Sequence, residues 1–128
     1  MTYRFLTRQA VDAMHQEQLR RHGGAAGIRD ENALESALAR PANKAIYGQP
    51  DIHELAAAYL FGIARNHPFV DGNKRAAVVA AGAFLIFNGF EIVVNQGTLY
   101  EFVMAVASGE IDEHGAAMFL RDHVQPVA

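Results

Sequence analysis

Apolar residues recur along most of this chain at the spacing of helices rather than strands. Thr7 is placed to cap a first helix that runs to about Arg21. The inward positions of this helix are Val11, Met14 and Leu19. Three glycines within residues 22–27 then end it, because glycine accepts the left-handed conformation found at helix ends.

The next stretch predicts a short helix and a loop. Asp30 can cap a helix from Glu31 to Ala39. Residues 41–50 contain two prolines, an asparagine and a glycine, which favour a loop. Since this loop also carries the apolar Ile46 and Tyr47, it either packs on the body of the protein or presents a surface to a partner.

A third helix is expected from Ile52 to about Asn66, with Asp51 as its cap. Its apolar residues cover more than one stripe, so we expect it to be largely buried. Proline disfavours the helical conformation in the residue before it. His67, which precedes Pro68, should therefore be extended or lie in a turn.

The second half of the chain predicts three more helices. One begins near Gly72 or Asn73, ends near Asn88 and is apolar nearly all round, which predicts a central, buried helix. A short strand is expected over residues 91–94, then a helix to about Ala107 with Thr98 and Glu101 as a capping box. Asp112 can cap a sixth helix to about Val124, and residues 125–128 should fray. The predicted fold is all-α, a compact single-domain bundle of about six helices with little or no sheet.

Composition narrows the classes of function. The 128 residues fit one domain, and 51% of them are hydrophobic, enough for a core. A net charge of -3 argues against a protein that coats nucleic acid. The absence of cysteine excludes disulfides and thiolate metal clusters. The longest apolar run is shorter than the roughly 20 residues of a membrane span, and no signal peptide is visible. We expect a cytoplasmic protein with no direct nucleic acid or membrane partner.

Residues 67–75, with the sequence HPFVDGNKR, gather the chemistry of the chain in one turn. The imidazole of His67 can accept a proton from an attacking hydroxyl near neutral pH. Asp71 is an oxygen ligand suited to Mg²⁺, which nucleotide sites hold with one or two carboxylates and phosphate oxygens. Gly72 allows the backbone to approach a ligand closely, and Phe69 should point into the core.

Asn73, Lys74 and Arg75 open the helix that follows this turn. Backbone N–H groups of a first helical turn attract anions, whereas two cations there are unfavourable unless an anion binds. Taken singly, each feature has an ordinary interpretation: a structural histidine, a turn, and a solvated Lys-Arg pair. Together they favour a phosphate site, and the chain has neither a Walker-type loop nor the protein-kinase loops.

The nine residues resemble the signature of the Fic/Doc superfamily, and specifically its Doc (death-on-curing) toxin branch. Residues 21–24 (RHGG) and 108–111 (SGEI) are also similar to Doc proteins. The resemblance covers nearly the whole chain and implies one Fic/Doc domain over residues 1–128. Fic proteins, which mostly transfer AMP, carry glycine at the position of Lys74 and arginine at that of Val78. Both departures match the Doc pattern.

What the resemblance implies is a protein kinase that uses ATP and Mg²⁺. The Doc lysine fills the space that AMP-transferring enzymes keep for the outer phosphates of ATP, so the nucleotide presents its γ-phosphate instead. The target class is elongation factor Tu, phosphorylated on a threonine, which stops translation and growth. His67 would be the general base and Asp71 a Mg²⁺ ligand. Gly72, Asn73, Lys74 and Arg75 would bind phosphate.

The resemblance also implies a partner. Doc toxins belong to type II toxin-antitoxin systems and are inhibited in trans by a small antitoxin, here expected to be Phd-like. The internal inhibitory pattern of some Fic proteins is not found in this sequence. Two alternatives remain at this point: a Fic-type AMP transferase that uses the same base and metal site, and a non-catalytic module that binds an antitoxin.

Overall fold

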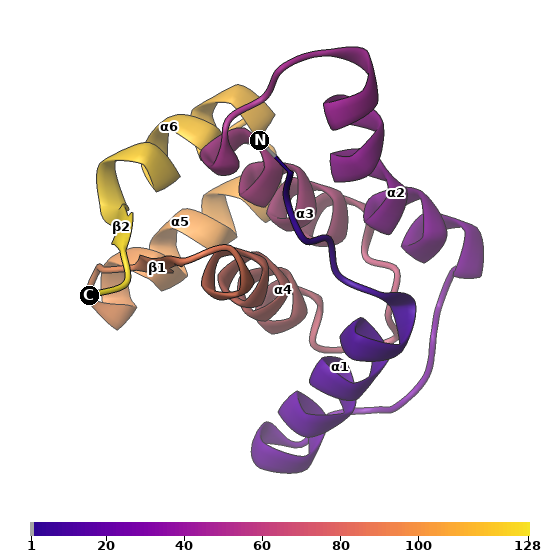
Figure 1. Cartoon of the computed structure of the whole chain (residues 1–128). Helices are drawn as coiled ribbons and strands as arrows, with labels where there is room; N and C mark the ends of the chain where they lie inside the picture. The colour runs from indigo at the N-terminus through magenta and orange to yellow at the C-terminus, as the bar shows by residue number, and fades with distance from the viewer. Residues whose placement is uncertain (1) are drawn as a thin grey trace.

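The structure is a computed structural model that describes residues 2–128, and Met1 lies outside the described residues. Residues 2–128 form six helices and two short strands (Figure 1). In chain order they are α1 (Arg8–His22), α2 (Glu31–Tyr47), α3 (Ile52–Asn66), α4 (Asn73–Phe87), β1 (Phe90–Ile92), α5 (Gln96–Ser108), α6 (Glu113–His123) and β2 (Val124–Pro126). The expected all-α fold with little sheet is confirmed.

Helix α3 is the centre of the molecule and packs against α2, α4, α5 and α6 (Figure 1). Its burial from Leu55 to Leu60 is complete, as the continuous apolar pattern predicted. Helix α4 packs on α1, α3 and α5, but only one face of it is buried. Ile86 and Phe87 at its end are exposed, so burial all round is not observed.

Five of the helices in residues 2–128 begin with a side-chain cap. The capping residues are Thr7, Asp30, Asp51, Asn95 and Asp112. Four of these caps were predicted from the sequence. The predicted capping box of Thr98 and Glu101 is wrong, because α5 begins earlier and the side chain of Asn95 accepts the backbone N–H of Thr98 at 2.8 Å.

The predicted end of α2 at Ala39 and the loop over residues 41–50 are wrong. The helix continues through Pro41 to Tyr47. Proline removes one helical hydrogen bond and crowds the carbonyl four residues earlier, that of Ala37. Packing outweighs this cost, because Pro41 is fully buried and Ala37 lies so close to Gly62 of α3 that a Cβ on Gly62 would be only 3.2 Å from it. Tertiary contact therefore overrides the local signal.

The expected fraying of residues 125–128 is also wrong. Strand β2 pairs antiparallel with β1, with Glu91 opposite Gln125, so the expected strand is present but begins at Phe90. The N–H of Val127 donates to Gly89 O at 2.9 Å. Asn88 binds Arg4 through both its side-chain oxygen and its amide nitrogen, at 2.8 and 3.0 Å. Both ends of the described chain are thus tied to the C-terminal end of α4.

No helix within residues 2–128 combines the length and apolar character that a membrane span requires.

Candidate active site

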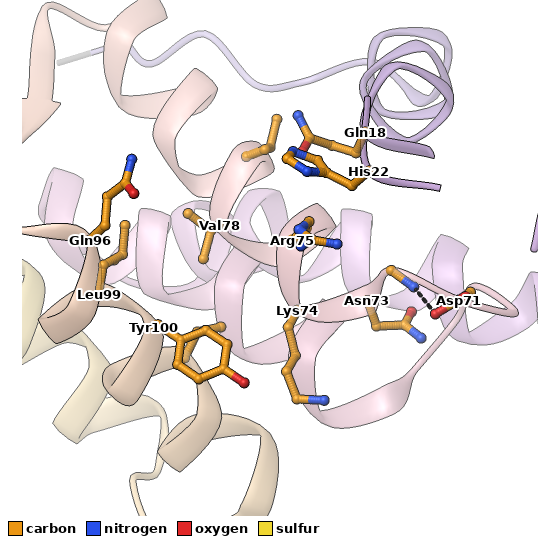
Figure 2. A pocket seen from close by; sticks show the side chains of 13 residues that line it. Gln18, His22, Asp71, Asn73, Lys74, Arg75, Val78, Gln96, Leu99 and Tyr100 are labelled. Atoms are coloured by element: carbon orange, nitrogen blue, oxygen red, sulfur yellow. Dashed lines mark hydrogen bonds between the residues drawn. The ribbon is translucent and has the colours of Figure 1, made fainter. Parts of the chain in front are cut away.

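A pocket of about 540 Å³ opens at the N-terminal end of α4 (Figure 2). Its walls come from the last turns of α1, from the residues that open α4, and from one face of α5. The lining residues are Gln18, His22, Asp71, Gly72, Asn73, Lys74, Arg75, Val78, Val79, Gln96, Leu99, Tyr100 and Val103. The pocket therefore has a cationic end and an apolar wall, a combination suited to a phosphorylated organic ligand.

Five of the six residues predicted as site residues line this pocket, from Asp71 to Arg75. The sixth, His67, is exposed at the other end of the turn and is not a lining residue. Its backbone is left-handed, with φ 47° and ψ 57°, and caps the C-terminus of α3. The expectation that His67 leaves the helical conformation is confirmed, in its turn form rather than the extended one.

The middle of the turn is closed by Asn73. Its side-chain oxygen accepts the N–H of Phe69 and its amide nitrogen donates to Phe69 O, each at 2.9 Å. The ring of Phe69 is 1% exposed, as predicted. Because both polar groups of the Asn73 side chain are engaged, it is the backbone N–H of this residue that is free to meet a ligand at the helix start.

The carboxylate of Asp71 is held by two backbone N–H groups. Its Oδ1 accepts from Gly72 at 2.8 Å and its Oδ2 from Ala25 at 3.2 Å. A Cβ on Gly24 would lie 2.8 Å from that Oδ2, so a larger residue there would displace the carboxylate. The residues described include no group of three or more metal-ligating side chains. One exposed carboxylate with spare lone pairs fits Mg²⁺ held partly by phosphate and water, but not an all-protein metal cage.

The start of α4 carries unbalanced positive charge. Within residues 2–128, neither Lys74 nor Arg75 has a carboxylate at ion-pair distance. The N-cap is Gly72, which offers no side-chain bond, and the first turn has no acidic residue. Figure 2 shows Lys74 on the side of Tyr100, and Arg75 on the side of Gln18 and His22. An anion in the pocket would satisfy both cations and the first N–H groups of the helix.

Segment 24–30, between α1 and α2, lies along the back of the turn. Ile28 and Phe69 form a β-bridge, and the N–H of Val70 donates to Gly27 O at 3.0 Å. The N–H groups of Arg29 and Asp30 both donate to Pro68 O, at 2.7 and 3.1 Å. Two chain segments that are far apart in the sequence thus build the turn together.

Sequence reasoning missed several residues of this site. His15 is 4% exposed, packs on Phe69 and bonds to the backbone of Asp71. It lacks metal-ligand spacing, and no local pattern marks it. Leu99 and Val103 on α5 are typical of an ordinary core stripe, and only the folded chain shows that they form a pocket wall with Tyr100.

The sequence of this chain is similar to those of known proteins. A sequence profile described as "Fic/DOC family" matches residues 5–85. "Protein kinase doc" of Escherichia phage P1 is 33% identical over 119 residues, covering 92% of this chain and 94% of the relative. "Toxin Doc" of Mycolicibacterium smegmatis (strain ATCC 700084 / mc(2)155) is 43% identical over 76 residues, covering 57% of this chain and 58% of the relative.

Proposed function

Because this chain belongs to the Fic/Doc family and is similar to Doc toxins, we propose that it is the toxin of a type II toxin-antitoxin system. Its activity would be that of an ATP-dependent protein kinase. It would transfer the γ-phosphate of ATP to a threonine hydroxyl of elongation factor Tu and thereby arrest translation. The name of the phage P1 relative supports kinase activity.

The observation that carries this proposal is the position of Lys74 in the pocket. Lys74 lies in the first turn of α4, and Val78, one turn further on, also lines the pocket. The AMP-transferring Fic proteins that this chain resembles have glycine and arginine at these two positions. Here the ammonium group occupies space at the helix start and the later position offers no charge, which favours a single terminal phosphate at the turn.

The transfer step follows from the groups present. His67 would accept the proton of the threonine hydroxyl while the hydroxyl oxygen forms a bond to the γ-phosphorus. The bond from the γ-phosphorus to the bridging oxygen breaks, and ADP leaves. Lys74, Arg75 and the first N–H groups of α4 would stabilise the charge on the transferred group, which is most of what phosphoryl transfer asks of a protein.

The metal and the two substrates have separate places in this proposal. Asp71 would hold Mg²⁺, which neutralises charge on the phosphates. The nucleotide would fill the pocket, with its base against Leu99 and Tyr100 of α5. Since His67 lies outside the pocket, the target threonine would approach from the open side of the turn.

The proposed inhibitor is a Phd-like antitoxin that binds in trans. Similarity to the relative named "Toxin Doc" supports this partner. Exposed apolar residues Ile46 and Tyr47 at the end of α2 are available to a partner protein.

The test is to incubate the protein with Mg²⁺, elongation factor Tu and ATP labelled at either the α- or the γ-phosphate. Label from the γ-phosphate on a threonine of the factor is the expected result. Label from the α-phosphate alone would replace the kinase with an AMP transferase. The matched control is His67→Ala, which should abolish both transfer and growth arrest. Equal growth arrest by this variant and the natural protein would mean that catalysis is not the mechanism.

A further inference from the structure

The backbone of His67 has a conformation that non-glycine residues seldom adopt. It is the only non-glycine residue with positive φ among residues 2–128. Such a conformation persists only where surrounding contacts hold it, and it is found preferentially at functional sites. The direction of the imidazole depends on this backbone, so whatever holds the backbone also aims the side chain.

Arg29 holds it. The Nε of Arg29 donates to His67 O at 2.6 Å, and its Nη2 donates to Asn66 O at 2.7 Å. Both carbonyls lie at the C-terminal end of α3, where helical carbonyls lack partners and the helix dipole favours a cation. The planar guanidinium is suited to two parallel bonds of this kind. The backbone N–H of Arg29 also donates to Pro68 O at 2.7 Å, so one residue binds three consecutive carbonyls of the turn.

We propose that Arg29 is a positioning residue that aims His67 at the target hydroxyl. Arg29 comes from the segment between α1 and α2, and its side chain reaches carbonyl oxygens of α3 and the turn rather than the pocket. This inference rests on the proposed function, because Arg29 affects catalysis only if His67 is the general base.

The other end of the turn is held independently. Asn73 bonds to both backbone groups of Phe69, and His15 bonds to Asp71 O at 2.8 Å. Loss of the Arg29 side chain should therefore disturb the base and leave the phosphate-binding residues in place. The expected kinetic result is a lower kcat with an unchanged KM for ATP. If loss of the Arg29 side chain disordered the whole turn, KM for ATP would rise as well.

The chain offers a matched control. Arg65 is also exposed and lies in the last turn of α3, but its side chain reaches Ala107 O at 3.4 Å and not the turn. Arg29→Gln and Arg65→Gln remove one cation each from the same helix end. We expect Arg29→Gln to lower kcat by about 100-fold, the cost of a small misplacement of a reacting group. Arg65→Gln should keep natural kcat. Arg29→Lys, which keeps the charge but not the planar fork, should rescue only in part.

A second measurement separates this inference from the proposed function. The imidazole NMR signals of His67 should shift or broaden in Arg29→Gln and stay unchanged in Arg65→Gln, whether or not the protein transfers phosphate. If the natural protein transfers no phosphate and the signals still respond in this way, the kinase proposal fails and the positioning role stands. His67 signals that are identical in Arg29→Gln and the natural protein would overturn the positioning role, as would full rescue by Arg29→Lys.

Discussion

The imidazole of His15 lies flat against the ring of Phe69, with ring centroids 3.7 Å apart and an angle of 14° between the planes. The same imidazole donates from Nε2 to Asp71 O at 2.8 Å. One side chain of α1 therefore fixes both the buried anchor of the turn and the backbone of the proposed metal ligand. Because His15 is 4% exposed, water competes little for this bond.

Two substitutions at His15 should separate its packing from its hydrogen bond. His15→Phe keeps a ring on Phe69 and loses the donor, so we expect the free energy of unfolding to fall by about 1 kcal/mol. His15→Ala also leaves a cavity and should cost about 3 kcal/mol. Urea denaturation measures both values. Equal losses in the two variants would show that the stacked ring contributes nothing.

Gly24→Ala should weaken the use of Mg²⁺. The new Cβ would lie 2.8 Å from Asp71 Oδ2 and 3.3 Å from Asp71 Cγ, which forces the carboxylate to move. Displacing a group that orients a metal ligand should raise the Mg²⁺ concentration for half-maximal activity by about tenfold. A magnesium titration of the phosphate-transfer rate measures this.

The control for that titration is Gly23→Ala. Gly23 also has a positive φ, so alanine is strained there too, but its Cβ would meet no atom within 4 Å. The Mg²⁺ requirement should stay natural in this variant. A similar rise in both variants would mean that backbone strain, and not contact with Asp71, is the cause.

Lys74→Gly should change which phosphate is transferred. Without the ammonium group, we expect γ-phosphate transfer to fall by about 100-fold, the loss typical of removing one transition-state donor. Transfer of α-label should appear in its place. The sequence has one other lysine, and Lys44→Gly is the matched control. Lys44 does not line this pocket, and its ammonium group lies 2.9 Å from the carboxylate of Glu113. Loss of γ-phosphate transfer without any transfer of α-label would show that Lys74 does not decide which phosphate is transferred.

Asp51 should make the fold sensitive to acid. Burial alone would raise the pKa of Asp51, but the N–H of Glu54 and the guanidinium of Arg121 outweigh burial and hold this pKa below its ordinary value of 3.8. A carboxyl with a lowered folded pKa adds stability above its unfolded pKa, and this stability is lost as the pH falls through the folded pKa. The natural protein should therefore lose stability below about pH 4.

Asp51→Asn keeps an N-cap side chain but cannot titrate. Its thermal midpoint should fall less between pH 7 and pH 3 than that of the natural protein. Arg121→Gln should act in the same direction, because it removes one of the groups that lower the pKa of Asp51. If the thermal midpoints of the natural protein and of Asp51→Asn fall in parallel with pH, Asp51 is not the source of the acid sensitivity.

Helix starts could be predicted where one side chain binds its own first turn. The caps at Thr7, Asp30, Asp51 and Asp112 need only such a local bond, and all four were predicted from the sequence. Near residue 95 two local caps compete, and the sequence does not decide between Asn95 and Thr98. At Pro41 the local signal was misleading, because burial against α3 decides where α2 ends.

The site shows the same division between local and distant contacts. Residues 71–75 are consecutive, so their meeting around one pocket followed from the helix start. Arg29 and His15 reach the turn from 38 and 56 residues away, and no spacing rule relates them to it. The wall formed by α5 depends on how that helix packs against α4, which a periodic apolar pattern leaves undetermined.

The bonds of Asn88 and Gly89 bring residues 4 and 127 to the same helix end, whereas the cationic residues Lys74 and Arg75 of the pocket lie at the other end of α4. A helix of 15 residues is about 22 Å long at 1.5 Å per residue. Fusion partners attached beyond either residue would therefore sit well away from the cationic end of the pocket. Joining the two ends with a short peptide and opening the chain elsewhere should also be tolerated, which makes this fold a practical scaffold for circular permutation.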